Sequence, residues 1–247
     1  MKISGNTILL TGGGSGIGRE LAQRWHDLGN QVIITGRRLD PLTQTAQGRD
    51  GIHPYVLDIT DAAAIAQFAD MIVARHPTLN VLVNNAGIML YEHISAARDL
   101  TDAQDMITTN VLGPIRLIDA LVDHLHSAPD AAIINVTSGL AFVPLVGAAT
   151  YSATKAALHS YTLALRQALK GKIEVIEIVP PAVQTELTPG QSQQEGYLPL
   201  DQFIDETMQQ FETGNPGPEV CVPRVLFLRN AEAEGRLDQA VEALASV

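Results

Sequence analysis

Tyr151 and Lys155 lie four residues apart in the run Thr-Tyr-Ser-Ala-Thr-Lys, and Ser138 lies thirteen residues before the tyrosine. On a helix, residues four apart share a face, so this spacing brings the phenol and the ammonium group together. An isolated phenol titrates near pH ~10, which makes it a poor proton donor or acceptor at neutral pH. One positive charge at ~4 Å, at an effective dielectric of ~20, contributes roughly 4 kcal/mol, or about three pKa units at most. The pair therefore predicts a tyrosine whose pKa is lowered into the range of general acid–base catalysis.

A second candidate site is the glycine-rich run Thr-Gly-Gly-Gly-Ser-Gly-Ile-Gly at residues 11–18, between an apolar run and an amphipathic one. Glycines permit a tight turn and let the backbone approach a pyrophosphate, which the following helix N-terminus stabilises. The plain alternative is a turn with no ligand. Its place at the first strand-to-helix junction favours a dinucleotide-binding turn, in which the expected contacts come from Gly12, Ser15, Gly16, Ile17 and Gly18.

Two arginines follow the second apolar run, which ends in Ile-Thr-Gly-Arg-Arg at residues 34–38. Folds that bind NAD often place an acid here to accept a hydrogen bond from the ribose 2′-hydroxyl. In this chain Gly36 stands in that region, and the guanidinium groups of Arg37 and Arg38 suit a 2′-phosphate. The alternative is a pair of solvated surface arginines. The pattern favours NADP(H) over NAD(H).

Short β-branched runs alternate with longer amphipathic segments along the chain. The expected strands are Asn6–Thr11, Gln31–Gly36, Ile52–Asp58, Leu79–Asn84, Ala131–Ser138 and Ile173–Val179. The expected helices lie near residues 16–29, 39–47, 61–76, 101–126 and 150–170. Because the strands are apolar almost throughout, they indicate a parallel sheet covered on both faces. The fold class is α/β, a Rossmann-like doubly wound parallel sheet in a single domain over residues 1–247.

The last third of the chain departs from this alternation. Residues 184–218 are rich in Gln, Gly and Pro, which indicates a substrate-lid insertion with a short helix near 200–213. Its apolar side chains, among them Phe203 and Phe211, are expected to contribute to a substrate pocket of mixed polarity. Residues 219–247 are expected to form C-terminal helices, so six parallel strands are predicted.

The composition excludes several classes of function. The single cysteine, Cys221, forms no internal disulfide, which favours a reducing compartment and a cytoplasmic protein. The net charge of −11, with no basic run, argues against nucleic acid or an anionic membrane as a partner. Without a His-Glu-x-x-His motif or a cysteine pair, a metal site is not expected.

Motifs at correct order and spacing from about residue 5 to 185 resemble the short-chain dehydrogenase/reductase family of classical type. They are the glycine run at 11–18, Asn-Asn-Ala-Gly at 84–87, Asn110, Ser138, Tyr151 and Lys155. The resemblance implies a nicotinamide cofactor and a serine–tyrosine–lysine site completed by asparagine. It also implies a homodimer or larger homo-oligomer formed by the helices after Asn110 and through Tyr151.

The resemblance assigns a role to each catalytic residue. Tyr151 would exchange a proton with the substrate oxygen, and Ser138 would hydrogen-bond that oxygen. Lys155 would lower the tyrosine pKa and bind the nicotinamide ribose, while Asn110 would hold a water in a proton relay from Lys155.

Further cofactor contacts are implied on the same grounds at Asp58, Ile59, Asn85, Ala86, Pro181, Val183 and Thr185. The chain departs from the family at Pro180-Pro181-Ala182, where proline is usually followed by glycine. Pro181 fixes φ and has no backbone N–H, so the nicotinamide pocket has an altered shape. This segment and the C-terminal end resemble the DltE-like branch of the family.

The predicted function is hydride transfer between a nicotinamide cofactor and a small carbonyl or alcohol substrate, as in a carbonyl reductase or alcohol dehydrogenase. The alternative is a catalytically silent NAD(P)-binding sensor or interaction protein, although such a protein has no need of four proton-transfer residues. An epimerase or dehydratase of the extended relatives would need a larger C-terminal domain. Ser138 has no neighbouring nucleophile-elbow motif, which argues against acyl transfer.

Overall fold

A computed structural model describes residues 1–214 and 216–245. Within these residues the strands form one seven-stranded sheet. The strands are β1 (Thr7–Thr11), β2 (Gln31–Gly36), β3 (Ile52–Val56), β4 (Leu79–Asn84), β5 (Ala132–Val136), β6 (Glu174–Val179) and β7 (Glu219–Cys221).

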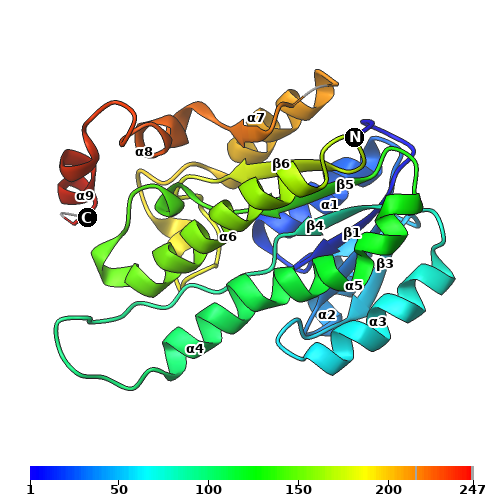
Figure 1. The fold of residues 1–247 in the computed structure, drawn as a ribbon, viewed down its shortest axis with the longest axis horizontal. Coiled ribbons are helices and arrows are strands. Elements are labelled where there is room, and N and C mark those ends of the chain that lie inside the picture. The colour runs from blue at the N-terminus through cyan, green and yellow to red at the C-terminus, as the bar shows by residue number, and fades with distance from the viewer. Residues whose placement is uncertain (215, 246–247) are drawn as a thin grey trace.

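All neighbouring strands of the sheet are parallel, in the order β3-β2-β1-β4-β5-β6-β7. The chain runs outward from β1 to β3, crosses back, and continues from β4 to β7 (Figure 1). The direction of winding therefore reverses between β1 and β4. At such a switch point the loops beyond the carboxyl ends of the strands diverge and leave room for a ligand.

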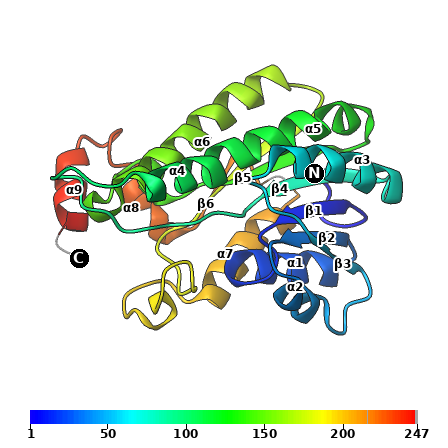
Figure 2. The same cartoon turned by 90° about the horizontal axis from the view of Figure 1, so that it is seen from below.

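Helices cover both faces of the sheet, as Figure 2 shows, with α3, α4, α5 and α6 on one side and α1, α2 and α7 on the other. Two further helices, α8 and α9, lie at one end of the molecule. The helices are α1 (Gly16–Asp27), α2 (Leu39–Ala46), α3 (Ala62–Arg75), α4 (Thr101–Ile107), α5 (Gly113–Ser127), α6 (Ala149–Ala168), α7 (Leu200–Glu212), α8 (Leu226–Arg229) and α9 (Leu237–Ala245).

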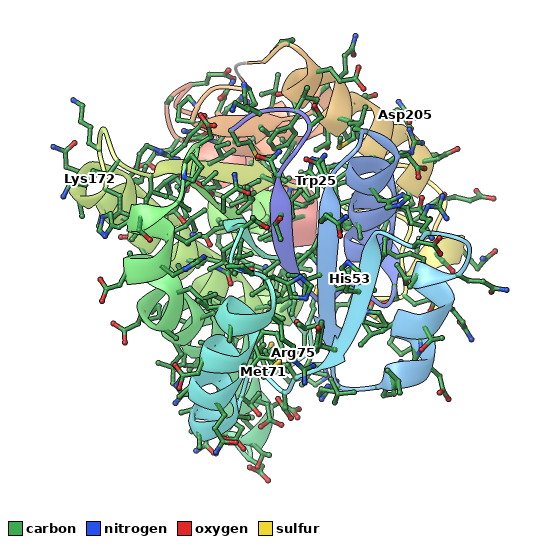
Figure 3. The ribbon with its side chains drawn as sticks, turned by 90° about the vertical axis from the view of Figure 1, so that its right-hand side faces the viewer. Trp25, His53, Met71, Arg75, Lys172 and Asp205 are labelled. Atoms are coloured by element: carbon green, nitrogen blue, oxygen red, sulfur yellow. The ribbon has the colours of Figure 1, made fainter. Side chains whose placement is uncertain are left out.

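Each face of the sheet has its own apolar core, because strands covered on both sides direct alternate side chains to opposite layers. One core joins Ile8 and Ile34 to Trp25 of α1 and Phe203 of α7. Figure 3 shows Trp25 in the interior and Asp205 of α7 at the periphery. The second core lies under α3, α5 and α6. The predicted α/β class, parallel sheet and single domain are confirmed.

The predicted number of six strands is wrong, because residues 219–221 form a seventh. In β7, Val220 pairs with Ile178 of β6 and is buried. C-terminal helices were predicted for the whole of residues 219–247. Pro223 instead begins a short 3-10 helix, and α8 starts only at Leu226. An ion pair between Arg229 and Glu219, with N–O distances of 2.6 and 2.9 Å, folds α8 back against β7.

The helix expected over residues 101–126 is divided into α4, a π-helical turn (Thr108–Leu112) and α5. Pro114 accounts for the irregularity, since it has no N–H to donate to the carbonyl of Asn110 four residues earlier. Asn110 is buried within this turn. Single π-helical turns of this kind recur at functional sites.

The segment 184–218 contains the expected helix, α7, but this helix belongs to the core. The ring of Phe211 packs edge-on against Trp25 at 5.7 Å, and Phe203 is fully buried, so neither aromatic side chain faces a substrate pocket as expected. The preceding loop is closed at its base, where Leu198 N–H donates to Ala182 O at 2.9 Å and Gln184 N–H donates to Leu198 O at 2.9 Å. Of the end of the region 219–247, Ser246 and Val247 lie outside the described residues.

Candidate active site

A cavity of about 390 Å³ opens at the carboxyl ends of the strands, at the switch point between β1 and β4. Every residue predicted to contact the cofactor lines it. These residues are Gly12, Ser15, Gly16, Ile17, Gly18, Arg37, Arg38, Asp58, Ile59, Asn85, Ala86, Tyr151, Lys155, Pro181, Val183 and Thr185. Ser138 also lines the cavity, whereas Asn110 lies behind its wall. The role of each residue stays a prediction.

The glycine-rich turn connects β1 to α1, and its glycines are required by space and by conformation. Gly12 has φ +72°, in the left-handed region, and a Cβ there would lie 2.9 Å from the Cα of Ala86. A Cβ at Gly18 would collide with the carbonyl of Gly12. The backbone of β1 and that of the loop after β4 can therefore approach closely beside the N-terminus of α1.

Asn85 fastens the loop after β4 to the glycine turn. Its Nδ2 donates to Thr11 O at 2.9 Å, and the Thr11 hydroxyl accepts from the N–H groups of Asn85 and Ala86 at 3.0 Å. The Asn85 amide thus supports the turn itself, in addition to its place in the cavity wall.

Arg37 and Arg38 follow the carboxyl end of β2 and are exposed at the cavity. Asp58 lies beyond β3, where its carboxylate accepts from Thr60 N–H at 2.9 Å and from the Thr60 hydroxyl at 2.8 Å. The Thr60 hydrogen bonds and the nearby charge of Arg37 hold the pKa of Asp58 below its usual value. This end of the cavity combines two exposed cations with one hydrogen-bonded anion.

Ser138 and Tyr151 meet at the other end of the cavity. Ser138 follows β5 and caps a short 3-10 turn, where its hydroxyl accepts from Leu140 N–H at 3.1 Å. The phenol of Tyr151, in the first turn of α6, lies close enough to the Ser138 side chain for Ser138 to lower its pKa. Lys155 lies one turn further along α6, with its Nζ 5.6 Å from the Tyr151 ring centroid and donating to Val136 O at 2.9 Å. The predicted spacing thus places all three side chains together.

The pKa of Tyr151 changes in the opposite direction from the predicted one. Burial raises the pKa of Tyr151 to about 12, and the Ser138 side chain opposes this only in part. Burial also lowers the pKa of Lys155 to about 8, against the opposing effect of the Glu177 carboxylate. The prediction considered the charge of the lysine but not the desolvation of the phenol, which is the larger effect here.

Asn110 is held by its neighbours on both sides. Its Oδ1 accepts from Ile88 N–H at 2.9 Å, and its Nδ2 donates to Ile88 O at 2.9 Å and to Thr154 Oγ1 at 3.1 Å. These bonds tie the π-helical turn to the loop after β4 and to α6. The side-chain amide is therefore engaged in protein contacts on both its oxygen and its nitrogen.

Gln191 is a residue that sequence reasoning missed. It is buried in the cavity wall, where Nε2 donates to Val183 O at 2.8 Å and to Thr185 Oγ1 at 3.2 Å. Its oxygen accepts from the Thr188 hydroxyl at 2.9 Å. The side chain fixes the loop after β6 on the cavity. In the sequence this glutamine begins the polar run Gln-Ser-Gln-Gln at residues 191–194, and nothing in that run distinguishes it from its neighbours.

No helix among the described residues is long and apolar enough to cross a membrane. Within residues 1–214 and 216–245, no group of three or more His, Cys, Asp or Glu could hold a metal ion.

Comparison with known proteins agrees with this geometry. Residues 6–196 match the family model for short chain dehydrogenases, so the chain belongs to the short-chain dehydrogenase/reductase family and is an NAD(P)-dependent oxidoreductase of that family. Within it, the chain is similar to the uncharacterized oxidoreductase DltE of Bacillus subtilis, with 40% identity covering 94% of this chain and 93% of that protein, which confirms the DltE-like branch.

The chain is also similar to a second curated protein and to a solved structure. Sulfoacetaldehyde reductase 2 of Chromohalobacter salexigens is 34% identical over 73% of this chain and 74% of its own length. The crystal structure of a short chain dehydrogenase from Burkholderia cenocepacia, in complex with NADP, has a TM-score of 0.82 at 26% identity, covering 98% of each chain.

Proposed function

We propose that the protein is an NADP(H)-dependent reductase of a small carbonyl compound, with oxidation of the alcohol as the reverse reaction. The observation that carries the proposal is the grouping of Ser138, Tyr151 and Lys155 in the wall of the same cavity that the glycine turn lines. Reduction of a carbonyl requires one hydride and one proton. In this arrangement Tyr151 can supply the proton, and the cavity lined by the glycine turn can hold the cofactor that supplies the hydride.

Tyr151 is suited to the proton-donating role. With a pKa raised to about 12, its phenol stays protonated at neutral pH and can pass that proton to a substrate oxygen. Ser138 can donate a hydrogen bond to the same oxygen as negative charge develops there. Lys155, with a pKa of about 8, is mostly protonated at neutral pH, so its charge stabilises the phenolate that remains.

The residues of the other end fit a dinucleotide phosphate. The space left by Gly12 and Gly18 admits a pyrophosphate beside the N-terminus of α1, and Arg37 and Arg38 supply guanidinium donors for a 2′-phosphate. When bound, the nicotinamide supplies the hydride. The NADP complex of the Burkholderia relative supports the preference for the phosphorylated cofactor.

A carbonyl panel tests this function directly. NADPH absorbance is followed with aldehydes and ketones of different size and charge, with the Tyr151→Phe protein as the blank. We expect the wild type to consume NADPH with at least one of these carbonyl compounds, and the Tyr151→Phe protein not to consume NADPH with the same compound. Equal rates for the two proteins on every active substrate would remove Tyr151 from the mechanism.

We also propose that the protein assembles as a homodimer or larger homo-oligomer through α5 and α6, the helices after Asn110 and through Tyr151. Leu112, the last residue of the π-helical turn that leads into α5, and Leu163 on α6 are large apolar side chains that are 38% and 45% exposed. Sedimentation of the wild type and of Leu163→Glu tests this surface. A wild-type monomer, or an assembly that Leu163→Glu leaves intact, would contradict it.

Two smaller expectations remain proposals. Within the predicted lid at 184–218, the part that contacts the cavity is Thr185, Glu186, Leu187 and Gln191, and we propose that this loop closes over the substrate. Protection of residues 184–199 from hydrogen exchange on substrate binding would support it.

A cytoplasmic location, predicted from the lone cysteine, is tested by cell fractionation.

A further inference from the structure

Glu177 is a carboxylate in the interior of the sheet, close to the candidate active site. It lies in the middle of β6 in the run Glu-Val-Ile-Glu-Ile-Val and is 0% exposed. A buried charge is costly unless it is paired and hydrogen-bonded. An acid at this position, in a strand with apolar neighbours, therefore calls for an explanation beyond packing.

The Glu177 carboxylate joins the segment after β5, which carries Ser138, to the helix that carries Tyr151. Its Oε1 accepts from the Thr137 hydroxyl at 2.6 Å, and Thr137 directly precedes Ser138. His159 Nδ1 lies within hydrogen-bond distance of both carboxylate oxygens, at 2.8 and 3.0 Å. Since Tyr151 and His159 are eight residues apart on α6, with Lys155 midway, they share one face of the helix.

The charge of Glu177 acts on groups from three elements. On α6 it raises the pKa of Lys155 against the effect of burial. On β7 it raises the pKa of Cys221, after burial and Glu219, and on α8 it raises that of Arg229, whose principal partner is Glu219. Among these, Lys155 is the one that touches the cavity.

We propose that Glu177 is a positioning residue of this active site, an inference that rests on the proposed function. Through Thr137 it fixes where Ser138 meets Tyr151, through His159 it fixes the rotation of α6, and its charge keeps Lys155 in the ammonium form. It does not touch the substrate or the cofactor, and it acts through residues that do.

The test uses Glu177→Gln, which keeps the shape of the side chain and removes its charge. Lysine side-chain signals are followed by NMR from pH 6 to 11 in the full-length protein without added cofactor, and the Lys155 signal is identified by its absence in Lys155→Met. We expect a midpoint near 8 in the wild type. In Glu177→Gln we expect a midpoint lower by roughly one pH unit, the order of a single nearby charge.

Two matched variants separate charge from position. Glu219 is the β7 residue opposite Glu177 in the strand register, and its carboxylate binds Arg229. Glu219→Gln removes this carboxylate and should leave the Lys155 midpoint unchanged. Thr137→Val breaks one hydrogen bond and leaves the Glu177 charge in place. We expect it to lower kcat about tenfold by misplacing Ser138, with the same Lys155 midpoint and the same KM for NADPH.

A Glu177→Gln protein with the wild-type midpoint and the wild-type kcat overturns the inference. If Glu177→Gln does not fold, Thr137→Val decides, and a wild-type kcat in that variant overturns it. The NMR midpoints can be measured even if no carbonyl is reduced, so the failure of this inference and that of the proposed function give different results.

Discussion

The two ends of the cavity are built in different ways. At the end formed by β1, α1 and β2, the shape comes from the backbone, where Gly12 and Gly18 allow close approach and the two arginines project from the surface. At the other end the shape comes from buried side chains, with Tyr151 and Lys155 at 6% and 5% exposure. Cofactor affinity at the first end should therefore fall when a substitution adds atoms to the backbone turn. Turnover at the second end should fall when a substitution removes a single functional group.

The largest expected effect lies at the side-chain end. Tyr151→Phe removes one hydroxyl and should lower kcat by about 10²–10⁴-fold, the usual contribution of a general acid. Because the backbone-built end is untouched, NADPH affinity measured by fluorescence titration should stay within about twofold of the wild type. More than one per cent of wild-type turnover would show that another group donates the proton.

The converse substitution at the backbone-built end adds a single methyl group. Gly18→Ala places a Cβ against the carbonyl of Gly12, which must move, and NADPH affinity should fall by about tenfold or more. Gly147→Ala is the control, since a Cβ there meets Tyr91 at an ordinary 3.7 Å and Gly147 is not part of the cavity lining. If both variants bind NADPH as the wild type does, the turn does not form the phosphate site.

A smaller effect is expected where the same end uses a side chain. Arg37→Asp exchanges a guanidinium for a carboxylate at the end of β2 and should shift the NADPH-to-NADH affinity ratio by about tenfold toward NADH. Arg75→Asp on α3 changes the net charge equally at a distance from the cavity. Equal ratios in these two variants would make Arg37 an ordinary surface charge.

A last effect concerns stability rather than turnover. The pKa of Lys155 is about 8 in the folded protein and near 10.5 when unfolded, so between these values the unfolded chain binds the additional proton. The contribution of Lys155 to the free energy of unfolding should therefore rise with pH across this window, by about 3 kcal/mol at most. Urea unfolding from pH 7 to 10.5 should show this rise in the wild type and a flatter profile in Lys155→Met.

The features that could be predicted from the sequence are those that depend on local spacing. The glycine turn and the pair at 151 and 155 each follow from one helix or one turn, and the structure brings them to one cavity. The alternation of apolar runs was sufficient to predict strands β1 to β6, because each of these strands has more than four residues and most are apolar nearly throughout.

The features that could not be predicted depend on distant contacts. The strand β7 has three residues and forms because Val220 pairs with Ile178, far away in the sequence. The direction of the Tyr151 pKa depends on burial, which spacing does not reveal. Glu177 is different, because an acid in the middle of a buried parallel strand is unusual and is visible in the sequence. It could have indicated a buried polar network beside the active site.

The two outer strands of the sheet limit how copies of the protein can associate. At one edge β3 contains Pro54, which has no N–H to offer, and at the other β7 is only three residues long. Both features are known to discourage a sheet from continuing into a second molecule. The protein should accordingly resist strand-mediated aggregation, and Pro54→Val, which restores a hydrogen-bond donor to the β3 edge, should precipitate faster on heating than the wild type.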